Sequence, residues 1–145
     1  NRAFCRTFLV LDEDMKITAY FTLGLKNLAF QDYVSNKKKK AIHGISSDVS
    51  NVPVILIGQL SKNNSFDSEL SGDLLLTYAL NMVRTAQKVV GGRVCLVETP
   101  NDETNQKVID FYEKYGFVKL QTDDNETMQQ MIIKCYARKY LMTIM

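Results

Sequence analysis

The chain has 145 residues, of which 46% are hydrophobic and 23% are charged, and its formal net charge is +2. This composition excludes an intrinsically disordered chain and predicts one folded domain over residues 1–145, while the charge is too small to indicate nucleic-acid binding by itself. No apolar run reaches the roughly 18 residues that a membrane-spanning helix needs, so we expect no membrane association.

The cysteines and the histidine limit the chemistry further. Cys5, Cys95 and Cys135 are widely spaced and form no CxxC pair, and His43 is the only histidine. An odd number of cysteines without a secretory signal favours reduced thiols and therefore a cytoplasmic protein. We expect no metal site, because zinc sites need clustered cysteine and histidine ligands.

A β-hairpin is predicted at the start of the chain. Residues 7–11 are apolar and partly β-branched, residues 12–14 form an acidic turn, and residues 17–25 resume with Tyr, Phe and Thr. Residues 31–51 are polar and include four consecutive lysines, so we predict a solvated loop or an edge excursion there. The apolar run at residues 54–57 predicts a strand that is covered on both faces.

Helical periodicity appears twice in the second half of the chain. Apolar residues at helical spacing predict a helix over residues 71–90, which Gly91 and Gly92 end. A buried strand is expected at residues 93–98. A second helix is predicted from near Glu103, and its apolar stripe consists of Val108, Phe111, Tyr112 and Tyr115.

The last elements complete the predicted order β β β α β α β β. Gly116 stands where a left-handed cap residue is expected, and strands are predicted from Phe117 and over residues 128–140. Helices that interrupt a system of hairpins imply an α/β (α+β) fold with a mixed, mostly antiparallel sheet flanked by helices.

The segment NQKVIDFYEKYGF, residues 105–117, resembles a late motif of the acyl-CoA-dependent N-acetyltransferases, the GNAT superfamily. VPVILIGQLSKN (residues 52–63) is similar to the family's fourth strand, and SGDLLLTYALNMV (residues 71–83) to the start of its cofactor-binding helix. The detailed resemblance is to bacterial members that include the acetylating toxins of toxin–antitoxin pairs. The strand and the one or two helices that normally precede the hairpin are not in this sequence, so we expect an incomplete N-terminal part.

This resemblance implies an N-acetyltransferase that moves an acetyl group from acetyl-CoA, as co-substrate, to an amine acceptor. The acceptor is not identified by the sequence, and aminoacyl-tRNA, as in toxin-type members, is one candidate. The other interpretation is a GNAT-fold binding or interaction module that has lost catalysis. A homodimer is left open.

The resemblance also assigns cofactor-binding residues at the start of the helix over residues 71–90. The backbone N–H groups of Ser71, Gly72 and Asp73 would bind the pyrophosphate, because a helix N-terminus attracts anions. Only Gly72 of three key loop positions is kept: Asp67 replaces a Gln or Arg, and Leu70 replaces a glycine. Asp67, together with Glu69, would oppose the bound anion if it pointed inward.

The remaining site residues come from the same resemblance. Tyr112 occupies the general-acid position, although its place on an apolar stripe fits a core aromatic equally well. Asn105 would bond the pantetheine arm, or simply the backbone at the helix start. A backbone N–H at Leu60 or Ser61 would stabilise the oxyanion. Glu98 is a candidate base acting through water, against the alternative of a solvated strand-end carboxylate.

The lysine run Lys37–Lys40 is the one feature that suggests RNA. Four lysines make only a few phosphate contacts, and charge runs are usually solvated, so we do not favour an RNA partner on this evidence.

Overall fold

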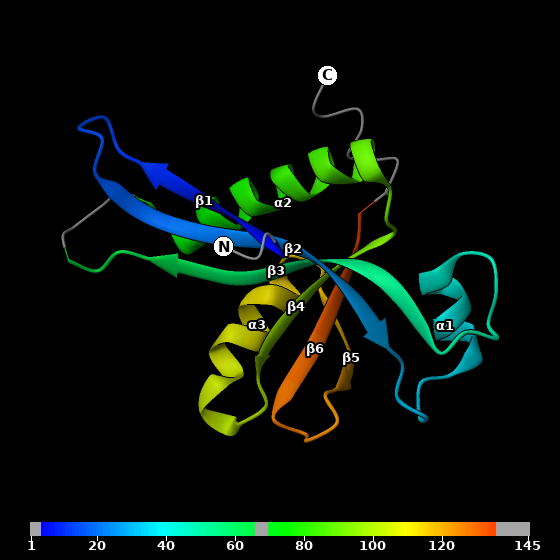
Figure 1. Cartoon of the computed structure of the whole chain (residues 1–145). Coiled ribbons are helices and arrows are strands. Elements are labelled where there is room, and N and C mark those ends of the chain that lie inside the picture. The colour runs from blue at the N-terminus through cyan, green and yellow to red at the C-terminus, as the bar shows by residue number, and fades with distance from the viewer. Residues whose placement is uncertain (1–3, 66–69, 136–145) are drawn as a thin grey trace.

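The computed structural model describes residues 4–65 and 70–135, and it forms one six-stranded sheet with the strand order β1-β2-β3-β4-β6-β5 (Figure 1). Only the β3–β4 pairing is parallel, which confirms the predicted mixed and mostly antiparallel α+β fold. The elements are β1 (Cys5–Leu11), β2 (Ile17–Ala29), α1 (Asn36–His43), β3 (Asn51–Lys62), α2 (Gly72–Val90), β4 (Val94–Pro100), the 3-10 turn η1 (Glu103–Asn105), α3 (Gln106–Lys114), β5 (Val118–Thr122) and β6 (Met128–Lys134).

The first two strands form the predicted hairpin, and its turn is held by one aspartate. The Asp12 carboxylate accepts hydrogen bonds from the backbone N–H groups of Asp14 and Lys16, both at 2.9 Å. Such local side-chain bonds replace the ladder bonds that the turn lacks. The acidic turn is therefore a structural feature.

The prediction of a solvated loop over residues 31–51 is wrong, because this segment contains α1. Ser35 caps the helix by accepting the N–H of Lys38, and Gly44 ends it with φ of 91°. Consecutive helical residues point about 100° apart, so the four lysines spread around α1 while Ile42 is buried. His43, expected in an exposed loop, is half-buried and accepts the N–H of Ser46.

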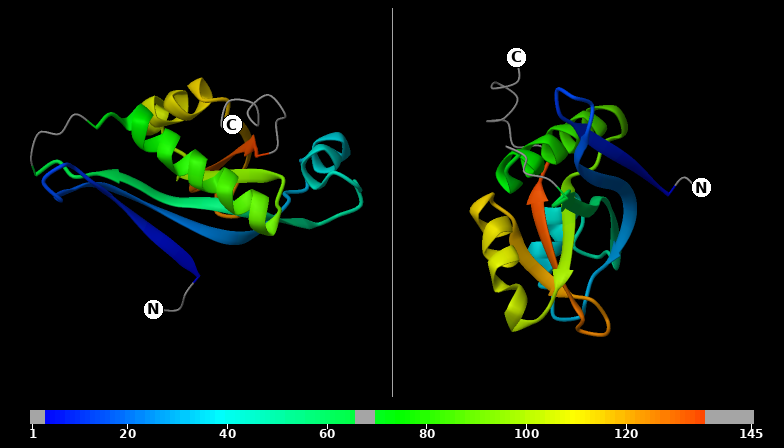
Figure 2. Two further views of the ribbon diagram at one scale, coloured as in Figure 1. Left: turned by 90° about the horizontal axis from the view of Figure 1, so that it is seen from above. Right: turned by 90° about the vertical axis from the view of Figure 1, so that its left-hand side faces the viewer.

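Two apolar clusters cover the two faces of the sheet. On one face lie α2 and α3, whose buried side chains pack on β2, β3, β4 and β6 (Figure 2). The second cluster lies on the other face beside α1 and contains Leu28, Val34, Ile42, Val52, Val54, Val94, Leu96, Leu120 and Ile132. Each fully buried Leu, Ile or Val contributes about 1.5–3 kcal/mol, so both clusters stabilise the sheet.

Both predicted helices of the second half are present, with one correction. Gly116 has the expected left-handed conformation, with φ of 95°. The predicted stripe of α3 is rotated, because Ile109 and Tyr112 are the buried residues and Val108 is 40% exposed. Of the strand predicted over residues 128–140, β6 ends at Lys134, and residues 136–140 lie outside the described residues.

The parallel strands β3 and β4 separate toward their carboxyl ends. They pair only at Ile55–Cys95, Leu56–Leu96 and Ile57–Val97, although both strands continue beyond these positions. Figure 1 shows the arrowheads of β3 and β4 pointing in different directions, with α3 beside β4. The region beyond the last paired residues, Ile57 and Val97, where the two strands diverge, is called the opening below. Ligands of α/β sheets commonly bind where neighbouring strand ends diverge.

Candidate active site

The opening is bounded by the ends of two strands, each of which leads on to a helix. One arm is the part of β3 after Ile57, and the other is the part of β4 after Val97. β3 leads to α2 and β4 leads through η1 to α3, and the first turn of α2 contacts the C-terminal end of α3 through Asp73.

The register of β3 directs one backbone donor into the opening. The Asn63 N–H bonds the Thr18 carbonyl at 2.8 Å, so this pair belongs to the hydrogen-bonded pairs of the β2–β3 ladder. Bonded and non-bonded pairs alternate in an antiparallel ladder, and Leu60 opposite Phe21 is a non-bonded pair. The Leu60 N–H therefore points away from β2 and toward the opening, while the Ser61 N–H points toward β2.

A β-bulge precedes Leu60 and depends on a glycine. Gly58 and Gln59 together oppose Thr22, where the β2–β3 register shifts. The Thr22 hydroxyl accepts the Gln59 N–H at 2.9 Å, and a Cβ on Gly58 would lie only 2.8 Å from that hydroxyl oxygen. Gly58 therefore leaves the space in which Thr22 fixes the bulge.

Tyr112 packs inside the core cluster that also contains Ile57 and Val97, the last paired residues before the opening. It is 9% exposed, its ring contacts Phe117, and its hydroxyl makes no hydrogen bond within the described residues. The core-aromatic interpretation is thus correct for the ring. The unbonded hydroxyl remains available to a ligand.

The environment of Tyr112 keeps its hydroxyl protonated. Burial raises the pKa of Tyr112 above its usual value of 10, and the nearby Cys95 raises this pKa further. A phenol in this state can donate a proton but is a poor base at neutral pH.

Asn105 is the last residue of η1 and the N-cap of α3, and it turns its side chain back onto the end of β4. Its amide nitrogen donates to the Pro100 carbonyl at 3.0 Å and to the Thr99 hydroxyl. The backbone-bonding alternative is therefore realised. The amide oxygen has no partner within the described residues and can still accept a hydrogen bond.

The start of α2 offers free N–H groups beside a paired carboxylate. The Ser71 hydroxyl caps the helix by accepting the Leu74 N–H at 3.1 Å, and the N–H groups of Gly72 and Asp73 have no intrahelical partner. The Asp73 carboxylate accepts a hydrogen bond from Tyr115 and lies 3.2 Å from the Lys114 ammonium. These contacts with α3 lower the pKa of Asp73, the Tyr115 bond most strongly.

The loop before α2 is only partly described. Leu70, at a position where the resemblance predicted a glycine, is 8% exposed and belongs to the core cluster. Asp67 and Glu69 lie outside the described residues, so the expected charge effect of these two carboxylates stays a prediction.

Glu98 is not the solvated carboxylate that the alternative interpretation expected. Its Oε1 lies 2.6 Å from the Lys26 ammonium, and its Oε2 accepts a hydrogen bond from Gln130 at 3.1 Å. The Glu98 side chain is only 19% exposed. Glu98 directly follows Val97, the last residue of β4 that pairs with β3, and so lies at the edge of the opening.

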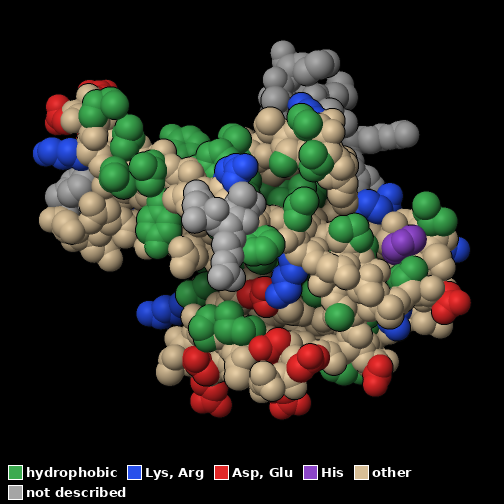
Figure 3. Space-filling view, in the orientation of Figure 1, with side chains coloured by type: hydrophobic (Ala, Val, Ile, Leu, Met, Phe, Trp, Pro, Cys, Tyr) green, Lys and Arg blue, Asp and Glu red, His purple; other side chains and the backbone are tan. Residues whose placement is uncertain are grey.

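Charged side chains are distributed unevenly around the opening. Acidic side chains gather along the lower edge in Figure 3. Exposed acidic residues follow the end of β4 (Asp102 and Glu103) and lie in the turn between β5 and β6 (Asp124 and Glu126). The run Lys37–Lys40 lies in α1, which precedes the opposite end of β3. The lysines are thus remote from the opening, as α1 is in Figure 1.

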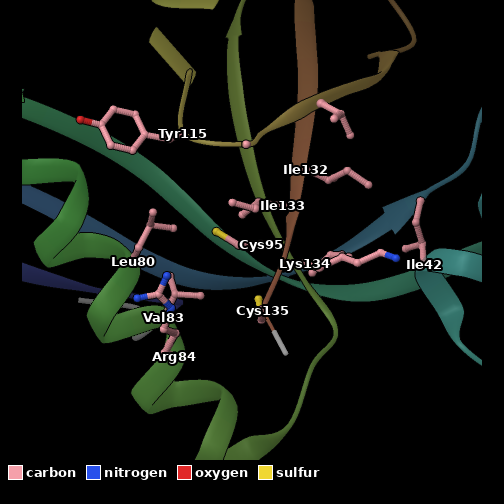
Figure 4. Close-up of a pocket in the computed structure, with 13 residues that line it drawn as sticks. Ile42, Leu80, Val83, Arg84, Cys95, Tyr115, Ile132, Ile133, Lys134 and Cys135 are labelled. Atoms are coloured by element: carbon pink, nitrogen blue, oxygen red, sulfur yellow. The ribbon is translucent and has the colours of Figure 1, made fainter. Parts of the chain in front are cut away.

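A separate cavity of about 330 Å³ lies at the other end of β4 (Figure 4). Cys95 and Cys135 line it together with side chains of α2 and β6. Burial raises the pKa of Cys135 to about 11 and that of Cys95 well above its usual value, so both thiols stay protonated at neutral pH. Cys95 is a buried small side chain, as predicted, and Cys135 is half-buried; neither thiol has the lowered pKa of a nucleophile.

Residues 4–65 and 70–135 contain no group of three or more His, Cys, Asp or Glu side chains that could bind a metal ion. Within these ranges, no helix combines the length and the apolar character that crossing a bilayer requires.

Sequence reasoning missed the residues that support this site. Thr22, Lys26 and Gln130 carry no motif, and they meet their partners only in the folded sheet. Gly58 did give a signal, since an isolated glycine in a strand often marks a bulge.

A mixed sheet whose adjacent parallel strands part beside two helices is the GNAT-type fold. Solved structures of the toxin AtaT and of KacT share this fold. A tyrosine-to-phenylalanine mutant of the AtaT toxin matches with a TM-score of 0.67 and 22% identity, over 97% of this chain and 72% of that chain. The KacTA–DNA complex matches with a TM-score of 0.67 and 21% identity, over 100% of this chain and 77% of that chain. AtaT in complex with acetyl-methionyl-tRNAfMet matches with a TM-score of 0.65 and 21% identity, over 97% of this chain and 75% of that chain. No protein-family model and no curated protein sequence matches the chain.

Proposed function

We propose that the protein is an N-acetyltransferase that transfers the acetyl group of acetyl-CoA to an amine. The observation that carries this proposal is the opening between β3 and β4. It combines a backbone N–H at Leu60 with a protonated phenol at Tyr112, whose hydroxyl makes no hydrogen bond within the described residues and whose ring packs in the cluster that contains the last paired residues. Acyl transfer from a thioester requires an oxyanion donor and an acid for the leaving sulfur.

The structural neighbours support the same reaction. AtaT has been solved with acetyl-CoA and with acetyl-methionyl-tRNAfMet. AtaT and KacT have each been solved as a tyrosine-to-phenylalanine mutant. We assign the acid role to Tyr112, because burial keeps its hydroxyl protonated and this hydroxyl makes no hydrogen bond within the described residues.

In the proposed mechanism, the amine attacks the thioester carbonyl while the Leu60 N–H donates to the developing oxyanion. The carbon–nitrogen bond forms and the carbon–sulfur bond breaks. Tyr112 gives its proton to the departing sulfur and recovers one from solvent. Glu98 accepts the proton that the amine loses, through a water molecule. A preorganised donor of this kind typically contributes 10²–10³ in rate, and a general acid 10²–10⁴.

The co-substrate would run from the opening to the start of α2. The free N–H groups of Gly72 and Asp73, beside Ser71, would bind the pyrophosphate at the positive end of the helix. The free amide oxygen of Asn105 would accept an N–H of the pantetheine arm. Because the Asp73 carboxylate lies at the same helix end, Lys114 and Tyr115 must keep its charge balanced when an anion binds.

The acceptor is an amine, and methionyl-tRNA is the first one to test, since AtaT has been solved with its acetylated form. Acidic side chains near the end of β4 would repel phosphates there. Any RNA contact by Lys37–Lys40 would therefore involve a part of the RNA remote from the reacting amine.

A second function, a binding module without catalysis, is favoured by the loop before α2. Leu70 is a core residue where the family has glycine, and Asp73 adds negative charge at the helix start. Acetyl transfer to methionyl-tRNA and to methioninamide, measured with wild-type protein, separates the two functions. Transfer to either probe supports the enzyme, and none at saturating acetyl-CoA leaves the binding module.

A further inference from the structure

Glu98 is held by both of its carboxylate oxygens. Lys26 contacts Oε1 at 2.6 Å, and Gln130 donates to Oε2 at 3.1 Å. The Lys26 and Glu98 side chains are 36% and 19% exposed, so this ion pair is partly shielded from water. A carboxylate bound on both oxygens has a fixed orientation, unlike one on a solvated strand end.

The two partners approach Glu98 from opposite sides of β4. Gln130 lies directly opposite Glu98 in the β4–β6 ladder. Lys26 comes from β2, and β3 lies between β2 and β4, so the ion pair passes over β3. The Lys26–Glu98 contact therefore links β2 to β4 across β3, the strand that carries Leu60. It does so close to the point where β3 and β4 stop pairing.

Gln130 is itself fixed by a chain of buried amides. Gln121 donates to the Gln130 oxygen at 2.7 Å and to the Ala29 carbonyl at 2.8 Å. The Gln121 oxygen accepts the Gln31 N–H at 2.8 Å. Gln121 and Gln130 are each 4% exposed, and a buried amide that is bonded on both ends cannot rotate freely. The amide of Gln130 is thus aimed at Glu98 before any ligand binds.

We propose that Lys26 and Gln130 are positioning residues for Glu98: together they hold its carboxylate at the edge of the opening in the orientation that accepts the proton of the amine. This inference rests on the proposed acetyl transfer. Lys26 does not touch a reacting atom, and it acts through Glu98. A displacement of a base by about 1 Å can cost on the order of 10²-fold in rate, so loss of Lys26 affects turnover more than co-substrate binding.

The experiment compares Lys26→Met, Lys26→Arg, Glu98→Gln and the Lys26→Met/Glu98→Gln double variant in acetyl transfer to methioninamide and methionyl-tRNA. Lys26→Met lowers kcat about tenfold or more and leaves the KM for acetyl-CoA within about twofold. Lys26→Arg restores most of kcat, because it keeps the charge. Adding Lys26→Met to Glu98→Gln causes no further loss, since a residue that acts through Glu98 has no effect without it. Lys119→Met, an exposed lysine on β5, is the matched control and retains wild-type kcat.

The inference is overturned, while the proposed function stands, if the kcat losses of Lys26→Met and Glu98→Gln multiply fully in the double variant. Wild-type kcat in Lys26→Met overturns it as well. If Lys26→Met fails to fold by circular dichroism, Gln130→Leu removes the other donor and is subject to the same double-variant comparison with Glu98→Gln. If the wild-type protein binds acetyl-CoA but acetylates neither probe amine, or binds none, the proposed function fails and this inference fails with it.

Discussion

The hydroxyl of Tyr115 donates a hydrogen bond to the carboxylate of Asp73, which ties the end of α3 to the first turn of α2. Lys114 lies 3.2 Å from the same carboxylate oxygen. A carboxylate is favourable at a helix N-terminus, but here it also lies where the pyrophosphate would bind. Asp73 thus stabilises the folded protein and opposes the proposed co-substrate.

Replacement of this carboxylate tests the competition. We expect Asp73→Asn to tighten acetyl-CoA binding by roughly twofold to fivefold in Kd at low salt, because one negative charge near the phosphates is removed. Calorimetric titration measures this change. The control is Asp110→Asn, which removes an exposed carboxylate of α3 instead. Weaker binding in Asp73→Asn would mean that Asp73 helps to build the site by holding Lys114 and Tyr115.

The same contact has a defined pH range. The pKa of Asp73 is lowered from 3.8, first by Tyr115 and then by Lys114, so its contribution to stability is lost as the pH falls below about 3.8. The pKa of Tyr115 is raised from 10 by Asp73, so the contribution is also lost as the pH rises above about 10. The difference in Tm between wild type and Tyr115→Phe should be constant between these limits and shrink outside them. A difference that varied through neutral pH would assign the contact to another group.

The bulge that presents Leu60 depends on Gly58. Gly58→Ala places a Cβ 2.8 Å from the Thr22 hydroxyl oxygen and disturbs its bond with the Gln59 N–H. We expect a loss of about 1–3 kcal/mol in the free energy of unfolding, measured in urea, together with reduced kcat. Gly72→Ala is the stability control, because its Cβ would meet only ordinary contacts at 3.8 Å from Phe111. Equal stability of Gly58→Ala and wild type would show that the bulge tolerates a side chain.

The acid role of Tyr112 predicts a change in turnover with little change in binding or stability. Tyr112→Phe should lower kcat by about 10²–10⁴ and leave the Kd for acetyl-CoA within about twofold, since only a proton donor is removed. Its unfolding free energy should match that of the wild type, because the hydroxyl bonds nothing within the described residues. Tyr78→Phe, on the exposed side of α2, is the matched control. Unchanged kcat in Tyr112→Phe would remove this residue from the mechanism.

Local patterns in the sequence were sufficient for most of the fold. The polar turn at Asp12, the apolar face of α2 and the left-handed Gly116 each depend on neighbours within a few residues, and all three are present. α1 was not predicted, because half of its residues are lysines and it contains a single buried residue, Ile42, and therefore shows no apolar periodicity. Its caps are Ser35 and Gly44.

The candidate site could be predicted only in part. Asn105 and Tyr112 stand in a local motif, so their spacing was readable. Lys26 is 72 positions from Glu98, and Gln130 is 32 positions from it, so only the strand order of the folded sheet brings them together. The direction of the Leu60 N–H likewise follows from the β2–β3 register, which no side chain in the sequence reveals.

Titration of the wild-type protein with acetyl-CoA in a calorimeter tests most directly whether the parted strands receive this co-substrate. We predict saturable binding of one acetyl-CoA per chain. The Tm should also rise, since a ligand at 100 times its Kd adds about 2.7 kcal/mol to the free energy of unfolding. Absence of binding heat and of any Tm shift at millimolar acetyl-CoA would contradict the proposed acetyltransferase.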